Sequence, residues 1–63
     1  MQRNAINLSA ELWTTADIAA FLRLSIRQAR DRITKLPSFP KPRIIGGSKR
    51  WVAAEVREWA GVN

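Results

Sequence analysis

Apolar residues recur at helical spacing over residues 15–22, which predicts a first short helix. Thr14 stands where its hydroxyl can cap this helix, and Asp17 occupies the third helical position, where an acidic side chain is favourable. Trp13 and Ile18 have the spacing of a hydrophobic staple, in which the residue before the cap packs on the fourth helical residue. We therefore expect the apolar face of this helix to support the core.

A second helix is predicted to begin at Ile26, because Ser25 and Gln28 have the spacing of a capping box. Its apolar positions fall within about 80° of one another around the helix. They form a narrow stripe that we expect to be buried: Ile26, Ala29, Ile33 and Leu36. Two short helices joined by about three residues, the second with a broad basic face, are typical of a helix-turn-helix, whose second helix reads DNA.

The prolines after the second helix predict a stiff, extended connector, because proline lacks a backbone donor and restricts the residue before it. They are Pro37, Pro40 and Pro42, and the helix is expected to end near Leu36. Phe39 lies between two of these prolines and is the expected anchor of the connector to the core.

Two short extended pieces around a glycine turn predict a β-hairpin, or wing, with a basic tip. The pieces cover residues 43–45 and 50–52, and residues 46–49 join them. A last helix is expected over about residues 53–60, and Gly61 is placed to end it.

These elements predict one domain over residues 13–60, preceded by an N-terminal arm (1–12) and followed by a C-terminal tail (61–63). The expected fold class is mainly α with a small β-hairpin, arranged as a winged helix-turn-helix DNA-binding domain. A chain of 63 residues suits one small domain, which buries about 60% of the surface that its unfolded chain exposes. Trp13, Trp51 and Trp59 are expected in that core, not on a surface that stacks on bases.

Residue types that are missing from the sequence limit its chemistry. The chain has no His and no Cys, so the usual general base, the thiolate metal site and the disulfide are all excluded. We expect no catalytic residue, no metal ligand and no cofactor. No apolar run approaches the roughly 20 residues of a membrane span, which favours a cytoplasmic, nucleoid-associated protein with no membrane partner.

The positive charges are segregated along the chain. Nine of the eleven Lys and Arg residues lie between Arg23 and Arg50, where Asp31 is the one acid. This stretch therefore carries +8, although the whole chain carries +6. Cations that bind a polyanion gather on the elements that face it, because counterion release is local to the contact. The distribution favours double-stranded DNA as the partner.

Five landmarks of the sequence occur in a recognisable order. They are the segment 13–19, Leu24-Ser25, the connector 39–43, Gly46-Gly47 with Arg50-Trp51, and Glu55-Val56 with Trp59. In this order they resemble the AlpA-like phage regulators, which share with phage excisionases the winged helix-turn-helix of the MerR superfamily. The resemblance covers about residues 12–60. It implies that the second helix enters the major groove and that the hairpin lies along the adjacent minor groove or the backbone.

The chain departs from this family early in the second helix. Many relatives have a Thr and an aromatic residue there, whereas this chain has Arg27, Gln28 and Ala29. Contact roles in this helix are therefore predicted from side-chain chemistry. The coiled-coil helix of MerR proteins has no counterpart in the sequence, so a small-molecule sensor is not expected.

Two side chains on the first exposed turn of the second helix are the candidates for reading bases. Arg27 can pair with O6 and N7 of guanine, and Gln28 with N6 and N7 of adenine. Asp31 is a third candidate, because a carboxylate can accept from a cytosine amino group. Asp31 can also pair with Lys35 or orient Arg27, and orientation is the favoured role. A plain Arg27–Asp31 ion pair on a solvated face is the alternative.

Other polar and basic residues are candidates for phosphate contacts, which position a protein on DNA without reading sequence. Those in or before the second helix are Arg23, Ser25, Arg30, Arg32 and Lys35. Those of the hairpin are Arg43, Lys49 and Arg50. Ser25 is foremost a helix cap, and for Arg50 the alternative is packing on Trp51 or pairing with Glu55.

The leading interpretation is a sequence-specific, double-stranded DNA-binding protein, a phage or prophage transcriptional regulator of the AlpA type. An excisionase that bends DNA, binds beside copies of itself and recruits a phage integrase is the closest alternative, because fold does not separate the two. The DNA-recognition part of a phage packaging subunit is a third interpretation. From another class, a small module that docks its basic face on an acidic protein stays open.

Overall fold

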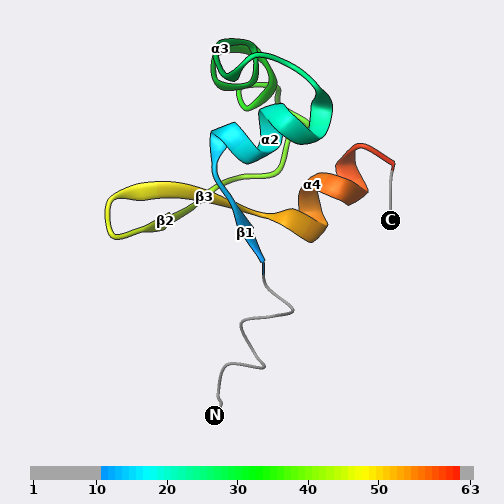
Figure 1. Ribbon diagram of the computed structural model, residues 1–63. Coiled ribbons are helices and arrows are strands. Elements are labelled where there is room, and N and C mark those ends of the chain that lie inside the picture. The colour runs from blue at the N-terminus through cyan, green and yellow to red at the C-terminus, as the bar shows by residue number, and fades with distance from the viewer. Residues whose placement is uncertain (1–10, 62–63) are drawn as a thin grey trace.

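The structure, a computed structural model, describes residues 11–61 and combines three helices with a three-stranded antiparallel sheet (Figure 1). In chain order the elements are β1 (Leu12–Trp13), α2 (Thr15–Leu22), α3 (Ile26–Gln28), the π-helix η1 (Ala29–Ile33), β2 (Arg43–Ile45), β3 (Ser48–Val52) and α4 (Ala53–Trp59). Since α3 and η1 are continuous, they form one helix, the α3–η1 helix. Most of the predicted arm and the last two residues of the predicted tail lie outside the described residues.

Helix α2 has the predicted bounds and the predicted cap. Thr14 Oγ1 accepts from the Asp17 N–H at 3.2 Å, and Asp17 Oδ2 accepts from the Thr14 N–H at 2.9 Å. The helix ends at Arg23, whose backbone is left-handed (φ 59°, ψ 45°) and whose N–H donates to the carbonyls of Ala19 and Ala20. The left-handed region disfavours a residue with a Cβ atom by roughly 1–2 kcal/mol.

The α3–η1 helix begins with the second predicted capping box. Ser25 Oγ accepts from the Gln28 N–H at 3.0 Å, and Gln28 Oε1 accepts from the Ser25 N–H at 3.2 Å. The end of the helix was predicted near Leu36, and this is wrong, because the helix ends at Ile33. Its last five residues, Ala29–Ile33, are π-helical, which the periodicity does not predict.

Thr34 makes two hydrogen bonds at the end of the π-helical turn. Its hydroxyl donates to the carbonyl of Arg30 at 2.9 Å, and its N–H donates to the carbonyl of Ala29, five residues back, at 3.0 Å. In an α-helix the N–H would bond to the carbonyl of Arg30, which here accepts from the Thr34 hydroxyl. The hydrogen-bond ring therefore widens by one residue.

Strand β3 lies in the centre of the sheet, with β1 on one side and β2 on the other. Leu12 of β1 pairs with Val52 of β3. The sequence does not predict strand β1. The predicted hairpin is confirmed, but its turn is shorter than expected, because Gly46 and Gly47 alone form it. Their φ angles are 58° and 82°, which glycine adopts without steric cost in a two-residue hairpin turn.

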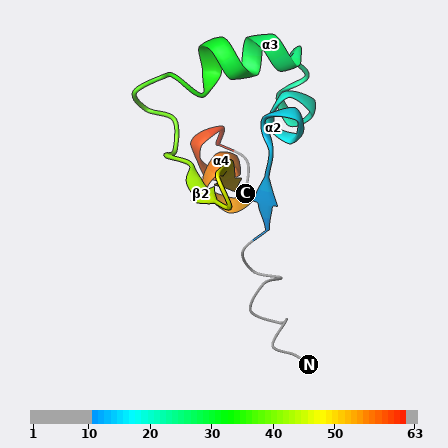
Figure 2. The ribbon, with the colours of Figure 1, turned by 90° about the vertical axis from the view of Figure 1, so that its left-hand side faces the viewer.

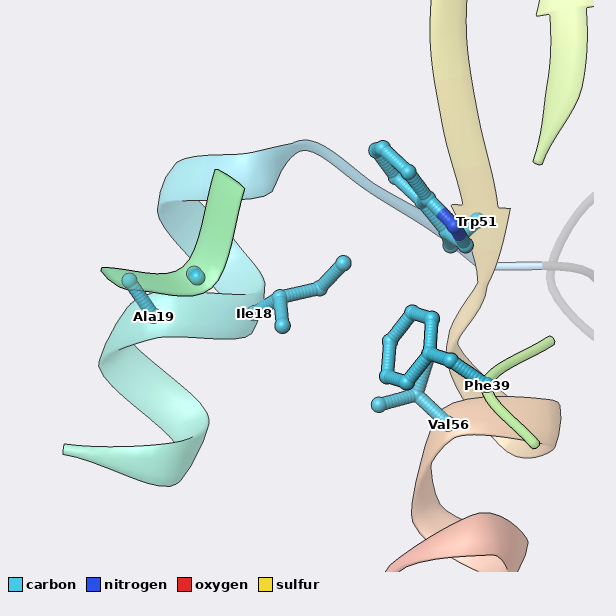
Figure 3. Packing of buried hydrophobic residues seen from close by; sticks show 6 residues of the cluster. Ile18, Ala19, Phe39, Trp51 and Val56 are labelled. Atoms are coloured by element: carbon cyan, nitrogen blue, oxygen red, sulfur yellow. The ribbon is translucent and has the colours of Figure 1, made fainter. Parts of the chain in front are cut away.

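The core joins α2, the connector, β3 and α4 (Figure 3). Side chains of Ile18, Trp51 and Val56 gather around Phe39, which is 4% exposed and is the anchor that the sequence predicts. The Phe39 ring centroid lies 4.9 Å from that of Trp59. Helix α4 follows directly from β3 and ends before Gly61, whose φ is 82°.

Two of the four residues in the predicted buried stripe of the second helix are buried or half-buried, and the other two are exposed. Ala29 is buried and Ile33 is half-buried, but Ile26 is 51% exposed and Leu36 is 41% exposed. Ile26 stands at the start of the helix, away from the core, and Leu36 lies past its end at Ile33. The π-helical turn changes the angular spacing, so residues beyond it leave the stripe.

Candidate nucleic-acid interface

The α3–η1 helix and the β2–β3 hairpin carry most of the basic residues, and both stand at the surface. Figure 1 shows the hairpin reaching out from the rest of the chain. Figure 2 looks at the tip of the hairpin and shows the α3–η1 helix crossing above it. Every residue from 43 to 49 is exposed, whereas Trp51, two residues further along β3, is buried. The hairpin therefore lies beyond the core from Lys49 outwards.

The cations between Arg23 and Arg50 face solvent. Eight of the nine are exposed and Arg50 is half-buried. Two of the nine form ion pairs within the described chain, Arg30 with Asp31 and Arg43 with Glu55. The other seven have no acidic partner among residues 11–61: Arg23, Arg27, Arg32, Lys35, Lys41, Lys49 and Arg50. Their charge is available to an external anion.

The structure separates the two main base-contact candidates. Arg27 is exposed and makes no ion pair within residues 11–61, so its guanidinium is free to reach a base edge. Gln28 is exposed too, but its Oε1 accepts from the Ser25 N–H and lies 3.3 Å from the Ser25 hydroxyl. Bidentate pairing of an amide with adenine uses both its oxygen and its amino group. Gln28 has only the amino group to offer while the cap is intact.

The expected partnership between Asp31 and Arg27 is absent from the described chain. Asp31 Oδ1 instead accepts from Nε of Arg30 at 3.1 Å. The alternative of a plain Arg27–Asp31 ion pair is therefore wrong. The contact that the favoured role of Asp31 needs, to orient Arg27, is not formed within residues 11–61, and that role on DNA stays a prediction. The change of geometry at Ala29 explains the difference, because a four-residue spacing no longer aligns side chains when the helix becomes π-helical.

The remaining helix candidates are exposed as expected. Arg32 and Lys35 lie at the end of the helix and just after it, and Arg23 lies before it. Ser25 is the cap that the sequence predicts.

The hairpin candidates differ in how they are held. Arg43 Nη2 donates to Glu55 Oε2 of α4 at 3.1 Å, and both side chains are more than a third exposed. The alternative pairing of Arg50 with Glu55 is wrong, because Glu55 pairs with Arg43 instead. Arg50 Nη1 donates to the carbonyl of Lys49 at 2.9 Å. Arg57, which was not a candidate, lies over the Trp13 ring at 5.4 Å.

A hollow of about 430 Å³ lies between the helix and the hairpin. Arg30, Asp31 and Lys35 line it from the α3–η1 helix and the residues after it, and Lys49 and Trp51 line it from β3. Thr15 of α2 also lines it, a residue that sequence reasoning missed because nothing in the local pattern brings it near the hairpin. The hollow joins cations from both basic elements.

Within residues 11–61, no group of three or more His, Cys, Asp or Glu side chains is placed to hold a metal ion. None of the helices in the described part of the chain has the length and apolar character needed to cross a membrane. Comparisons of the chain with protein-family models, with curated proteins and with solved structures gave no match.

Proposed function

We propose that this protein binds double-stranded DNA in the manner of a winged helix-turn-helix, with the α3–η1 helix in the major groove and the β2–β3 hairpin on the adjacent minor groove or backbone. The observation that carries the proposal is a set of six cations on these two elements or beside them that have no acidic partner among residues 11–61: Arg23, Arg27, Arg32, Lys35, Lys49 and Arg50. Helix α2, the α3–η1 helix and the hairpin follow one another in the order that such a domain requires.

The position of the acids favours the same partner. Asp17 caps α2, and Glu55 is held by Arg43 at the base of the hairpin. Asp31 is the one acid within the stretch from Arg23 to Arg50, and Arg30 pairs with it. The surface thus presents a strong positive field, which attracts a polyanion and raises its association rate.

Arg27 is the residue that we assign to base reading, since it is exposed, lies on the first turn of the helix and has no ion-pair partner in residues 11–61. Arg23, Arg32 and Lys35 are assigned to phosphates. The amino group of Gln28 is assigned a single hydrogen bond to a base or a phosphate, because its oxygen serves the cap.

The resemblance to AlpA-like phage regulators makes a phage or prophage transcriptional regulator the leading biological role, and an excisionase the alternative. Footprinting on phage or prophage DNA, combined with a bending assay, separates the two. A footprint at a promoter favours regulation. Several adjacent, bent sites beside an attachment site favour excision, and adjacent copies of the protein with an integrase are then the partners.

Titration with duplex DNA at several salt concentrations tests DNA binding itself. Four to six phosphate contacts give a log-log slope of about −4 to −5. An acidic polypeptide of matched length and charge is the control for plain charge attraction. A slope near zero, or equal binding of the polypeptide and the duplex, would contradict DNA binding and favour a module that docks on an acidic protein.

A further inference from the structure

The hollow between the α3–η1 helix and the hairpin has the chemistry of an anion site. Arg30, Lys35 and Lys49 place three positive charges on its lining against one negative charge, that of Asp31. Asp31 is already paired with Arg30 at 3.1 Å. Lys35 and Lys49 form no ion pair within residues 11–61. Their ammonium groups therefore remain for a ligand, together with the hydroxyl of Thr15.

The two lysines come from different parts of the chain, so they can hold an anion from two sides. Lys35 follows the α3–η1 helix, and Lys49 belongs to β3. Lys49 and Trp51 are two residues apart on one strand, so both side chains lie on the same face of the sheet. Trp51 packs in the core, and this face is therefore the one that turns toward the helix.

Trp51 supplies a second, independent observation. Its indole Nε1 is buried and has no hydrogen-bond partner in the described chain. The indole groups of the other two tryptophans are paired, that of Trp13 with Glu11 and that of Trp59 with Ser38. A buried donor without an acceptor is costly, and it belongs to a residue that lines the hollow.

The placement of the helix and the hairpin in the proposed complex identifies the anion. If the helix lies in a major groove and the hairpin in the adjacent minor groove, the sugar-phosphate strand that divides the two grooves must pass between them. The hollow is located there. Its volume, about 430 Å³, is ample for a phosphodiester group with part of its sugar.

We propose that this hollow is a phosphate site, in which Lys35 and Lys49 clamp one phosphodiester from two sides and the Thr15 hydroxyl donates to it. The inference rests on the proposed DNA-binding function and adds the place where the strand is held. The clamp fixes the spacing between helix and hairpin on the duplex, because both lysines must reach the same phosphate.

The test compares Lys49→Gln and Lys35→Gln with Lys41→Gln, which removes the same charge from an exposed lysine outside the hollow. Each clamp variant should weaken duplex binding about tenfold and reduce the magnitude of the salt slope by about 1. Lys41→Gln should change affinity by about twofold or less. Circular dichroism checks that all three variants fold, which their exposed positions favour.

NMR locates the bound anion through the backbone and indole N–H resonances of the chain. Two probes are added in separate titrations, duplex DNA and inorganic pyrophosphate. The expected result is that DNA shifts Thr15, Lys49 and the Trp51 indole. Two results together overturn the clamp but leave DNA binding intact. In the first, the unchanged chain binds DNA without these shifts. In the second, Lys41→Gln and Lys49→Gln lose equal affinity for the duplex. If pyrophosphate shifts these signals and DNA does not bind, the phosphate site stands and the proposed function fails. If neither probe binds, both fail.

Discussion

Arg43 and Glu55 join the base of the hairpin to α4 through an Nη2–Oε2 contact of 3.1 Å. They are twelve positions apart in the chain, and their side chains are 58% and 40% exposed. An exposed ion pair of this kind contributes about 0–1 kcal/mol to stability. Its larger effect is on charge, because Glu55 neutralises one cation of the basic surface.

Glu55→Gln should therefore strengthen duplex DNA binding while leaving stability nearly unchanged. The substitution frees Arg43 and removes a negative charge beside the hairpin. Glu58→Gln is the matched control, since Glu58 is exposed and forms no ion pair within residues 11–61. We expect a gain of about threefold for Glu55→Gln and less for Glu58→Gln at low salt, where surface charges act over longer distances. Equal gains for both variants would show that Arg43 does not contact DNA.

Arg23→Gly should raise stability and lower DNA affinity at the same time. Glycine adopts the left-handed conformation of residue 23 without the steric cost of a Cβ atom, which favours the folded state by about 1 kcal/mol. For a domain of this size the melting temperature should rise by about 4–8 °C. Arg23→Ala is the control, because it removes the same charge and keeps the strain. A lower melting temperature for Arg23→Gly would contradict the left-handed cap.

Arg27→Ala and Arg32→Ala should separate base reading from phosphate binding. Arg27→Ala is expected to cost about 1–3 kcal/mol with the target sequence and to relax preference at one base pair. Arg32→Ala should weaken binding to all sequences alike. Affinities measured against a panel of single-base variants of the footprinted site show the difference. Identical behaviour of the two variants would show that the reading face is misassigned.

Thr34→Val should convert the π-helical turn toward α-helix. Valine keeps the shape of threonine but lacks the hydroxyl that occupies the Arg30 carbonyl, so the backbone N–H of residue 34 can take that carbonyl instead. Carbonyl chemical shifts of Ala29 and Arg30, measured by NMR, report which of them accepts the hydrogen bond. Thr34→Ser retains the hydroxyl and should keep the native pattern. The same shift pattern in both variants would mean that the hydroxyl does not cause the π-helical turn.

Local signals explain which parts of the fold the sequence predicts well. The two capping boxes fix the starts of α2 and the α3–η1 helix, because cap and partner are three residues apart. The hairpin is equally local, since Gly46 and Gly47 meet the conformational need of its turn. Phe39 could be predicted as the anchor because it is the one large apolar residue between prolines.

Features that depend on distant partners were not predictable. Strand β1 has two residues and exists because β3 pairs with it, so it carries no periodicity of its own. The Arg43–Glu55 pair and the hollow beside Thr15 need the tertiary arrangement. The error over Asp31 has a different origin, because the helix is π-helical from Ala29 to Ile33 and the four-residue spacing of an α-helix does not apply there.

The complete exposure of residues 43–49 has an evolutionary consequence. Packing ends at Trp51, so substitutions from Arg43 to Lys49 disturb few interactions of the folded state apart from the pair with Glu55 and the glycine turn. Most surface substitutions of this kind change stability by no more than about 0.5 kcal/mol. This segment can therefore diversify under selection for new partners while the same small scaffold is inherited unchanged.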